Sequence, residues 1–145
     1  MPDTAKTLMA FDFGTQKMGI AVGQSLIESA NPLPLFPMKD GIPNWDNLLK
    51  IVKDHQPQVF LVGLPLNMDD SESELSARAR KFARRLRHQT NIETWMVDER
   101  LTTREARDTL DRYQSQGQAK RLSADSLAAA ILIENWYQTP QGLTP

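Results

Sequence analysis

Acidic side chains interrupt two apolar segments of this chain at places where a fold could bring them together. Asp12 follows Leu8 and Ala10 on one face of the alternating segment TLMAFDFG, if that segment is extended. Asp98 and Glu99 end a second apolar segment, IETWMVDER. If both segments are strands of one sheet, these acids lie near the same edge.

Asp125 is a further acid at an unusual place, because it lies in the apolar segment ADSLAAAILIENWY. In a helix it shares the face of Ala128, Ala129 and Leu132, which is the face that would pack on a sheet. The small alanines would let the helix come close enough for Asp125 to reach acids at the strand ends. Carboxylates gathered in this way repel by on the order of several kcal/mol unless they are protonated or bridged by a cation.

A divalent cation would remove this repulsion. Mg²⁺ prefers carboxylate oxygens and keeps several of its waters, which suits an open cluster of acids. Two such ions about 4 Å apart can activate a water and stabilise the leaving oxygen of a phosphodiester. We therefore expect Mg²⁺ or Mn²⁺, as two ions, and metal-assisted phosphodiester hydrolysis.

Each acid also has a structural interpretation. The helix dipole favours an acid such as Asp125 in a first turn, and Asp12 could shape the turn that includes Gly14. Asp98 or Glu99 could pair with the nearby Arg100 or Arg104. The joint occurrence of the acids, more than any one of them, favours the catalytic interpretation.

The elements that would position these acids can be read from periodicity. We expect strands over about 7–14, 18–25, 58–65 and 92–100, an edge strand or extended loop over 33–38, and helices over about 44–56, 74–88, 102–113 and 124–137. Asn44 and Ser123 are the expected helix caps. The inward side chains of the 74–88 helix are expected to be Leu75, Ala79, Phe82, Ala83 and Leu86.

The order of these elements predicts an α/β fold. An antiparallel meander is followed by parallel strands, which gives a mixed central sheet with helices on both faces. Residues 1–145 show no internal repeat and no linker, so we expect one domain.

Basic residues gather between 78 and 87. Six bases and no acid occur there, although the net charge of the chain is -1: Arg78, Arg80, Lys81, Arg84, Arg85 and Arg87. Arg80, Arg84 and Arg87 are spaced to share one helix face and could follow a phosphate backbone. Alternatively, these basic residues simply form the solvent-exposed face of a helix, with no nucleic-acid contact.

Composition narrows the remaining possibilities. The absence of cysteine excludes disulfides, thiolate zinc sites and a cysteine nucleophile. No apolar run approaches the roughly 20 residues of a membrane helix, and no signal pattern opens the chain. We expect a cytoplasmic protein without a membrane partner.

Four segments together resemble the YqgF family of RNase H-like proteins, also called RuvX: FDFGTQKMGIAVG, LVGLPLNMD, DERLTTREA and ADSLAAAILIENW. The resemblance implies an RNase H-like nuclease linked to 5′-end processing of pre-16S ribosomal RNA. It also implies that Asp12, one acid of the DER segment and Asp125 hold the metal. Within that segment the resemblance makes Glu99 the preferred ligand and Asp98 the reserve. Only one of them can share the cluster, because successive strand residues face opposite ways.

The same resemblance implies that Asn67 and Asp69 line the catalytic cleft. Two departures from the family pattern are visible. Asp70 stands where the family usually has Gly, and Lys17 follows Gln16 where the family often has Lys directly after the turn. Lys17 remains a candidate phosphate contact.

Other functions remain open. Members of the family are also linked to four-way DNA junctions. Cutting two strands of a junction in concert would need a symmetric homodimer, so a dimer would favour DNA as the substrate. A monomer would favour structured RNA, which is the substrate that we prefer. A non-catalytic RNA-binding module for ribosome assembly is a further alternative. The DFGT turn also resembles the phosphate turn of actin-like ATPases and sugar kinases, although those enzymes need two such domains.

Overall fold

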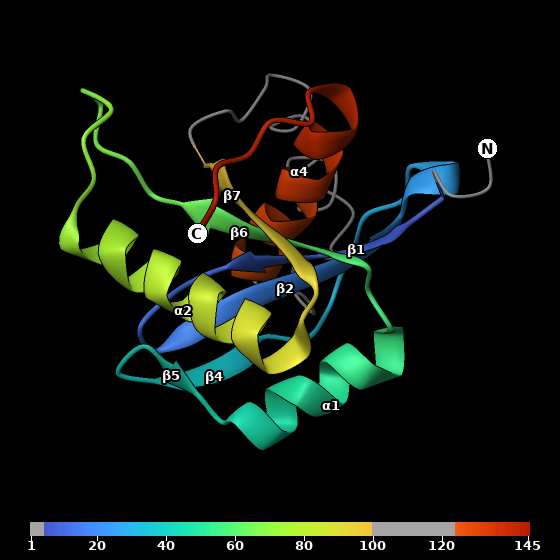
Figure 1. The fold of residues 1–145 in the computed structure, drawn as a ribbon, viewed down its shortest axis with the longest axis horizontal. Coiled ribbons are helices and arrows are strands. Elements are labelled where there is room, and N and C mark those ends of the chain that lie inside the picture. The colour runs from blue at the N-terminus through green and yellow to red at the C-terminus, as the bar shows by residue number, and fades with distance from the viewer. Residues whose placement is uncertain (1–4, 100–123) are drawn as a thin grey trace.

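The computed structural model describes residues 5–99 and 124–145. Seven strands in this part form one sheet, in the order β5-β4-β2-β1-β6-β7 with β3 paired to β2 (Figure 1). Their bounds are β1 Thr7–Asp12, β2 Lys17–Gln24, β3 Asn31–Pro32, β4 Phe36–Lys39, β5 Ile42–Pro43, β6 Val59–Leu64 and β7 Glu93–Asp98. A short 3-10 helix, η2 Ser25–Ile27, follows β2.

The sheet is mixed, as the sequence predicts. β2 runs antiparallel to β1, with Asp12 opposite Gly19. β6 is parallel to β1, and β7 is parallel to β6. The carboxyl ends of β1, β6 and β7 therefore lie at one edge, together with the start of β2.

Helices cover both faces of the sheet (Figure 1). α1 Trp45–His55 begins at Asn44, whose side chain accepts a hydrogen bond from the backbone N–H of Asn47. α2 Glu74–Thr90 begins after Ser73, and α4 is Ala124–Gln138. α1 and α2 pack with Met9, Phe11 and Val62 on one face, and α4 packs with Leu8, Ala10 and Leu61 on the other.

One inward position of α2 is predicted wrongly. Leu75 is 38% exposed, whereas Ser76 is fully buried. The Ser76 hydroxyl donates to the carbonyl of Pro65 and also takes part in a capping box with Ser73. Because the first turn of a helix has unpaired backbone N–H groups, a buried serine here satisfies polar groups that a leucine could not.

The predicted helix over 102–113, the connection after it and the Ser123 cap lie outside the described residues. None of the helices in residues 5–99 and 124–145 has the length and apolar character needed to cross a bilayer.

Candidate active site

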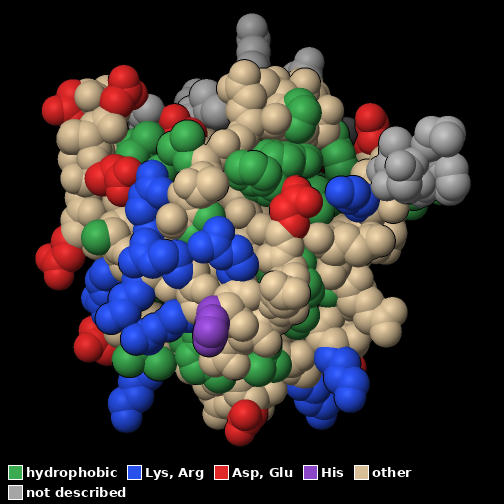
Figure 2. All heavy atoms as spheres, viewed as in Figure 1, with side chains coloured by type: hydrophobic (Ala, Val, Ile, Leu, Met, Phe, Trp, Pro, Cys, Tyr) green, Lys and Arg blue, Asp and Glu red, His purple; other side chains and the backbone are tan. Residues whose placement is uncertain are grey.

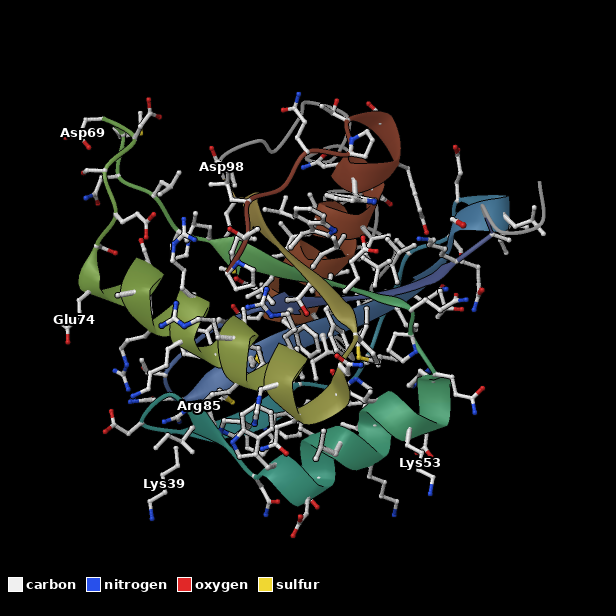
Figure 3. The ribbon with its side chains drawn as sticks, viewed as in Figure 1. Lys39, Lys53, Asp69, Glu74, Arg85 and Asp98 are labelled. Carbon is white, nitrogen blue, oxygen red and sulfur yellow. The ribbon has the colours of Figure 1, made fainter. Side chains whose placement is uncertain are left out.

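Strand alternation brings Asp12 and Glu99 to the α4 face of the sheet. Val97 packs in the core on the α4 side, whereas Met96 packs on the opposite side. Glu99 comes two residues after Val97, in the turn that follows β7, and lines a cavity together with Asp12. Asp98 is the last residue of β7, at the edge of the sheet where the chain leaves it (Figure 3).

Asp12, Glu99 and Asp125 form one acidic cluster, in which Asp12 is central. Its carboxyl group hydrogen bonds to both other carboxyl groups. Burial, and then the hydrogen bond and charge of Glu99, raise the pKa of Asp12 from 3.8 to about 9, with a further contribution from Asp125. Carboxylates in this arrangement cannot all be ionised without a compensating cation, so Asp12 holds a proton near neutral pH.

The proton distribution within the cluster is uneven. Burial raises the pKa of Glu99, while the hydrogen bond from Asp12 opposes that rise; the charges of Asp98 and Asp125 add to it. Asp12 is therefore the donor and Glu99 the acceptor. Asp125 also has a cationic neighbour, because the Nζ of Lys17 lies 3.6 Å from its Oδ2.

Two glycines, which the sequence analysis did not single out, make room for the acids. A Cβ on Gly19 would lie 1.9 Å from the carbonyl oxygen of Asp125, so α4 rests directly on β2 at this point. A Cβ on Gly63 would lie 2.3 Å from Oε1 of Glu99. Gly19 of β2 and Gly63 of β6 thus lie on the two strands that flank β1, which carries Asp12. A glycine inside a predicted strand often marks a place where another segment approaches the strand closely. Gly19 and Gly63 could therefore have been identified from the sequence by this rule.

We expect Gly19→Ala to lower stability by about 1–3 kcal/mol, since the added methyl group meets the backbone of α4 and must displace it. Gly63→Ala should lower stability less, because its methyl group meets the movable end of Glu99. Both variants should lose activity, since each moves one acid of the cluster. Urea unfolding and a cleavage assay measure the two effects, and equal stability losses would contradict this distinction.

A cavity of about 160 Å³ lies beside the acidic cluster. It is lined by Asp12 and Glu99 on the sheet side and by Ala128, Ile131 and Leu132 on α4. The small and apolar α4 side chains form one wall, and the carboxylates form the other. Such a low-dielectric site strengthens the interaction of the acids with any bound cation.

The donor set fits a divalent metal. Carboxylate oxygens are the ligands that such a metal prefers, and burial, together with the charges of neighbouring acids, raises the pKa values of Asp12 and Glu99. In residues 5–99 and 124–145, no three acidic or histidine side chains are already arranged as ligands around one point. The carboxyl groups instead hydrogen bond to one another, so a shared proton reduces the repulsion that a bound cation would otherwise reduce.

The raised pKa values predict a pH dependence of stability. A carboxyl group whose pKa is higher in the folded state than in the unfolded state stabilises the protein fully at pH values below its unfolded-state pKa. This contribution is lost as the pH rises through its folded-state pKa. In EDTA, the free energy of unfolding should therefore fall between pH 3.8 and about 9. The slope is at most about 1.4 kcal/mol per pH unit for one group. Asp12→Asn should flatten it in urea unfolding at pH 5 and pH 8, and an unchanged slope would contradict this result.

The family is decided by a comparison with family models. Residues 6–139 match the model described as "RuvX: Holliday junction resolvase". The chain belongs to the RuvX family. A relative from Acinetobacter baylyi is 74% identical over all of both chains, and one from Saccharophagus degradans is 46% identical over 93% of this chain and 95% of that protein. Both carry the description "Putative pre-16S rRNA nuclease".

Solved structures show that the RuvX fold here is RNase H-like. RuvC of Thermus thermophilus, determined in complex with a Holliday junction substrate, has a TM-score of 0.58 and 12% identity, over 92% of this chain and 94% of that chain. A fowlpox virus Holliday junction resolvase has a TM-score of 0.52, over 92% and 98%. The predicted fold class is thereby confirmed.

Asn67 and Asp69 are absent from the lining of the cavity beside the acidic cluster of this RuvX chain. Asn67 donates to Ser71 Oγ at 3.0 Å, and Asp69 Oδ1 accepts from the Ser71 N–H at 3.0 Å. Asp69 lies on a loop that extends beyond the sheet (Figure 3), and neither residue lines the cavity that holds Asp12. In the structure they shape the loop. Asp70 has a φ of 70°, in the left-handed region where glycine is most favourable.

The basic residues of α2 divide into two groups. Arg80 forms a bidentate pair with Glu72 at 2.8 Å, and its Nη1 donates to the carbonyl of Thr144 at 2.7 Å. It therefore holds the C-terminal segment, whose Leu143 pairs with Met96 at the edge of β7. Arg84 and Arg87 are exposed. A substrate contact by Arg80 would require its ion pair to break.

Proposed function

We propose that this RuvX-family chain is a metal-dependent nuclease that cleaves phosphodiester bonds at the acidic cluster. The observation that carries the proposal is the convergence of Asp12, Glu99 and Asp125 at the carboxyl edge of an RNase H-like sheet. An acidic cluster of this kind lowers the stability of the fold unless a cation or a proton binds it. This cost indicates that the cluster has a catalytic or binding role and does not serve to stabilise the fold.

Asp12, Glu99 and Asp125 would hold Mg²⁺ or Mn²⁺, as two ions. When bound, such ions lower the pKa of water and neutralise charge that develops on the phosphate oxygens. Asp98, at the end of the same strand as Glu99, is the reserve ligand.

The residues of the chain contribute in other ways. Asp12 must give up its proton when a cation enters, so affinity for metal should rise with pH. Lys17, beside Asp125, supplies a positive charge where the phosphate of a substrate would arrive. The apolar α4 wall, with Ile131 and Leu132, limits access of bulk water to one side of the cavity.

We further propose that the substrate is structured RNA, namely the 5′ region of pre-16S ribosomal RNA. This rests on the descriptions of the relatives, which include one 74% identical over its full length. In this proposal residues 1–145 are one nuclease domain acting in the cytoplasm, in ribosome biogenesis. Asn67, Asp69, Arg84 and Arg87 would meet substrate outside the acidic cluster.

A four-way DNA junction is the second candidate substrate. It is favoured by the description of the matching family and by the fold shared with RuvC. Paired cleavage of a junction would require a symmetric homodimer, whereas RNA processing is open to a monomer.

The test is cleavage of a precursor ribosomal RNA fragment and of a junction DNA by the purified protein, each in Mg²⁺, Mn²⁺ and EDTA. We expect the RNA to be cut in the presence of metal and left intact in EDTA. Preferential cutting of the junction would favour the DNA function. Binding of RNA without cleavage of either substrate would indicate a non-catalytic module.

A further inference from the structure

Two adjoining hollows flank Trp45 on the side of the molecule that carries α1 and α2. The larger has a volume of about 570 Å³ and the smaller about 220 Å³, and Trp45, Lys81 and Arg85 line both. Arg84, His88 and Gln89 complete the larger one. We call the two together the Trp45 groove.

The larger hollow is basic because of the helical spacing of its residues, whereas the smaller one also contains Asp40, which pairs with Arg78. Lys81, Arg84, Arg85 and His88 stand at i, i+3, i+4 and i+7, so they share one face of α2. Figure 2 shows Lys and Arg side chains gathered over this helix, with a histidine beside them. Lys81, Arg84 and Arg85 are exposed, and none of them forms an ion pair with another described residue.

Trp45 provides a flat aromatic surface among these charges. Its ring stacks on Phe82, with centroids 5.9 Å apart and an interplanar angle of 19°. That contact fixes the ring, which is half-buried and lines both hollows. A basic groove with a fixed aromatic ring is an arrangement by which proteins bind single-stranded nucleic acid. The Lys and Arg side chains contact the phosphates, and a nucleobase stacks on the ring.

The groove and the acidic cluster lie on opposite faces of the sheet. Phe82 and Trp45 belong to the core on the α1 and α2 side, whereas Asp12 faces the cavity walled by α4. A nucleic-acid segment in the groove is therefore not the segment that is cut at the acids. It must be a flanking part of the same substrate or a separate segment.

We propose that the Trp45 groove binds a single-stranded RNA segment that flanks the cleaved region, with Lys81, Arg84 and Arg85 on its phosphates and Trp45 against a base. This inference rests on the proposed action on RNA. The hollowed face of α2 shares Arg84 with the face of Arg80, Arg84 and Arg87 that the sequence predicts as a phosphate contact. Contact with backbone and ring surface predicts affinity with little dependence on base sequence.

The test is binding of a twelve-residue oligouridylate in EDTA, so that cleavage plays no part in the result. Arg84→Glu with Arg85→Glu should weaken binding at low salt by about tenfold or more. The log–log salt slope should fall in magnitude by about 1.4, since two phosphate contacts are lost at about 0.7 each on a single strand. The matched control is Lys50→Glu with Lys53→Glu on α1, which changes charge equally outside the groove (Figure 3).

A second readout does not depend on charge. Oligouridylate should quench the fluorescence of Trp45 in the wild-type protein, and Trp45→Phe should remove that quenching while it keeps an aromatic ring on Phe82. Absence of oligouridylate binding by the wild type, or equal weakening by the groove and control variants, would overturn the proposal. Failure of the protein to cut any RNA in Mg²⁺ would instead count against the nuclease function.

Discussion

Replacing Asp12 with asparagine should reduce metal-dependent cleavage by on the order of 100-fold or more, while the protein stays folded. Loss of groups that only support metal ligands already costs about 10- to 100-fold, and Asp12 lies at the centre of the acidic cluster. An asparagine keeps the shape of the side chain but removes the charge that would hold the cation. Initial rates on the precursor RNA fragment, at saturating Mg²⁺, measure the effect.

Asp54→Asn is the matched control for this variant, because Asp54 is an exposed acid at the far end of α1. It should leave the rate unchanged. Asp125→Asn should behave as Asp12→Asn does. A rate within a few-fold of wild type for Asp12→Asn, with metal present, would remove Asp12 from the metal site.

Glu99→Gln should be far more damaging than Asp98→Asn. Glu99 lines the cavity and hydrogen bonds to Asp12, whereas Asp98 influences Glu99 through its charge. We expect a loss on the order of 100-fold for Glu99→Gln and a loss of less than about tenfold for Asp98→Asn. The rates of the two variants under the same conditions measure this difference, and the reverse ranking would make Asp98 the ligand.

The positions of the acids could largely be predicted from the sequence, because alternation in a strand is a rigid rule. Asp12 follows Leu8 and Ala10, and all three prove to face α4. The preference for Glu99 over Asp98 rested on the family resemblance, and the structure places Glu99 in the cavity beside Asp12. Metal binding and catalysis by these residues remain predictions.

Contacts between segments far apart in the chain could not be predicted in this way. The pairing of Arg80 with Glu72 and with the carbonyl of Thr144 depends on where the C-terminal segment lies, which no local pattern specifies. The Trp45 groove likewise forms where the start of α1 meets α2. The burial of Ser76 in place of Leu75 reflects a hydrogen-bonding need that a hydrophobic pattern does not record.

Calorimetric titration with Mn²⁺ tests most directly whether the three carboxylates hold a divalent cation. We predict binding to the wild type and to Asp54→Asn, with release of a proton at pH 7 because the pKa of Asp12 is about 9. Asp12→Asn, Glu99→Gln and Asp125→Asn should each bind at least tenfold more weakly. Undiminished binding of Mn²⁺ by all three variants would contradict the account.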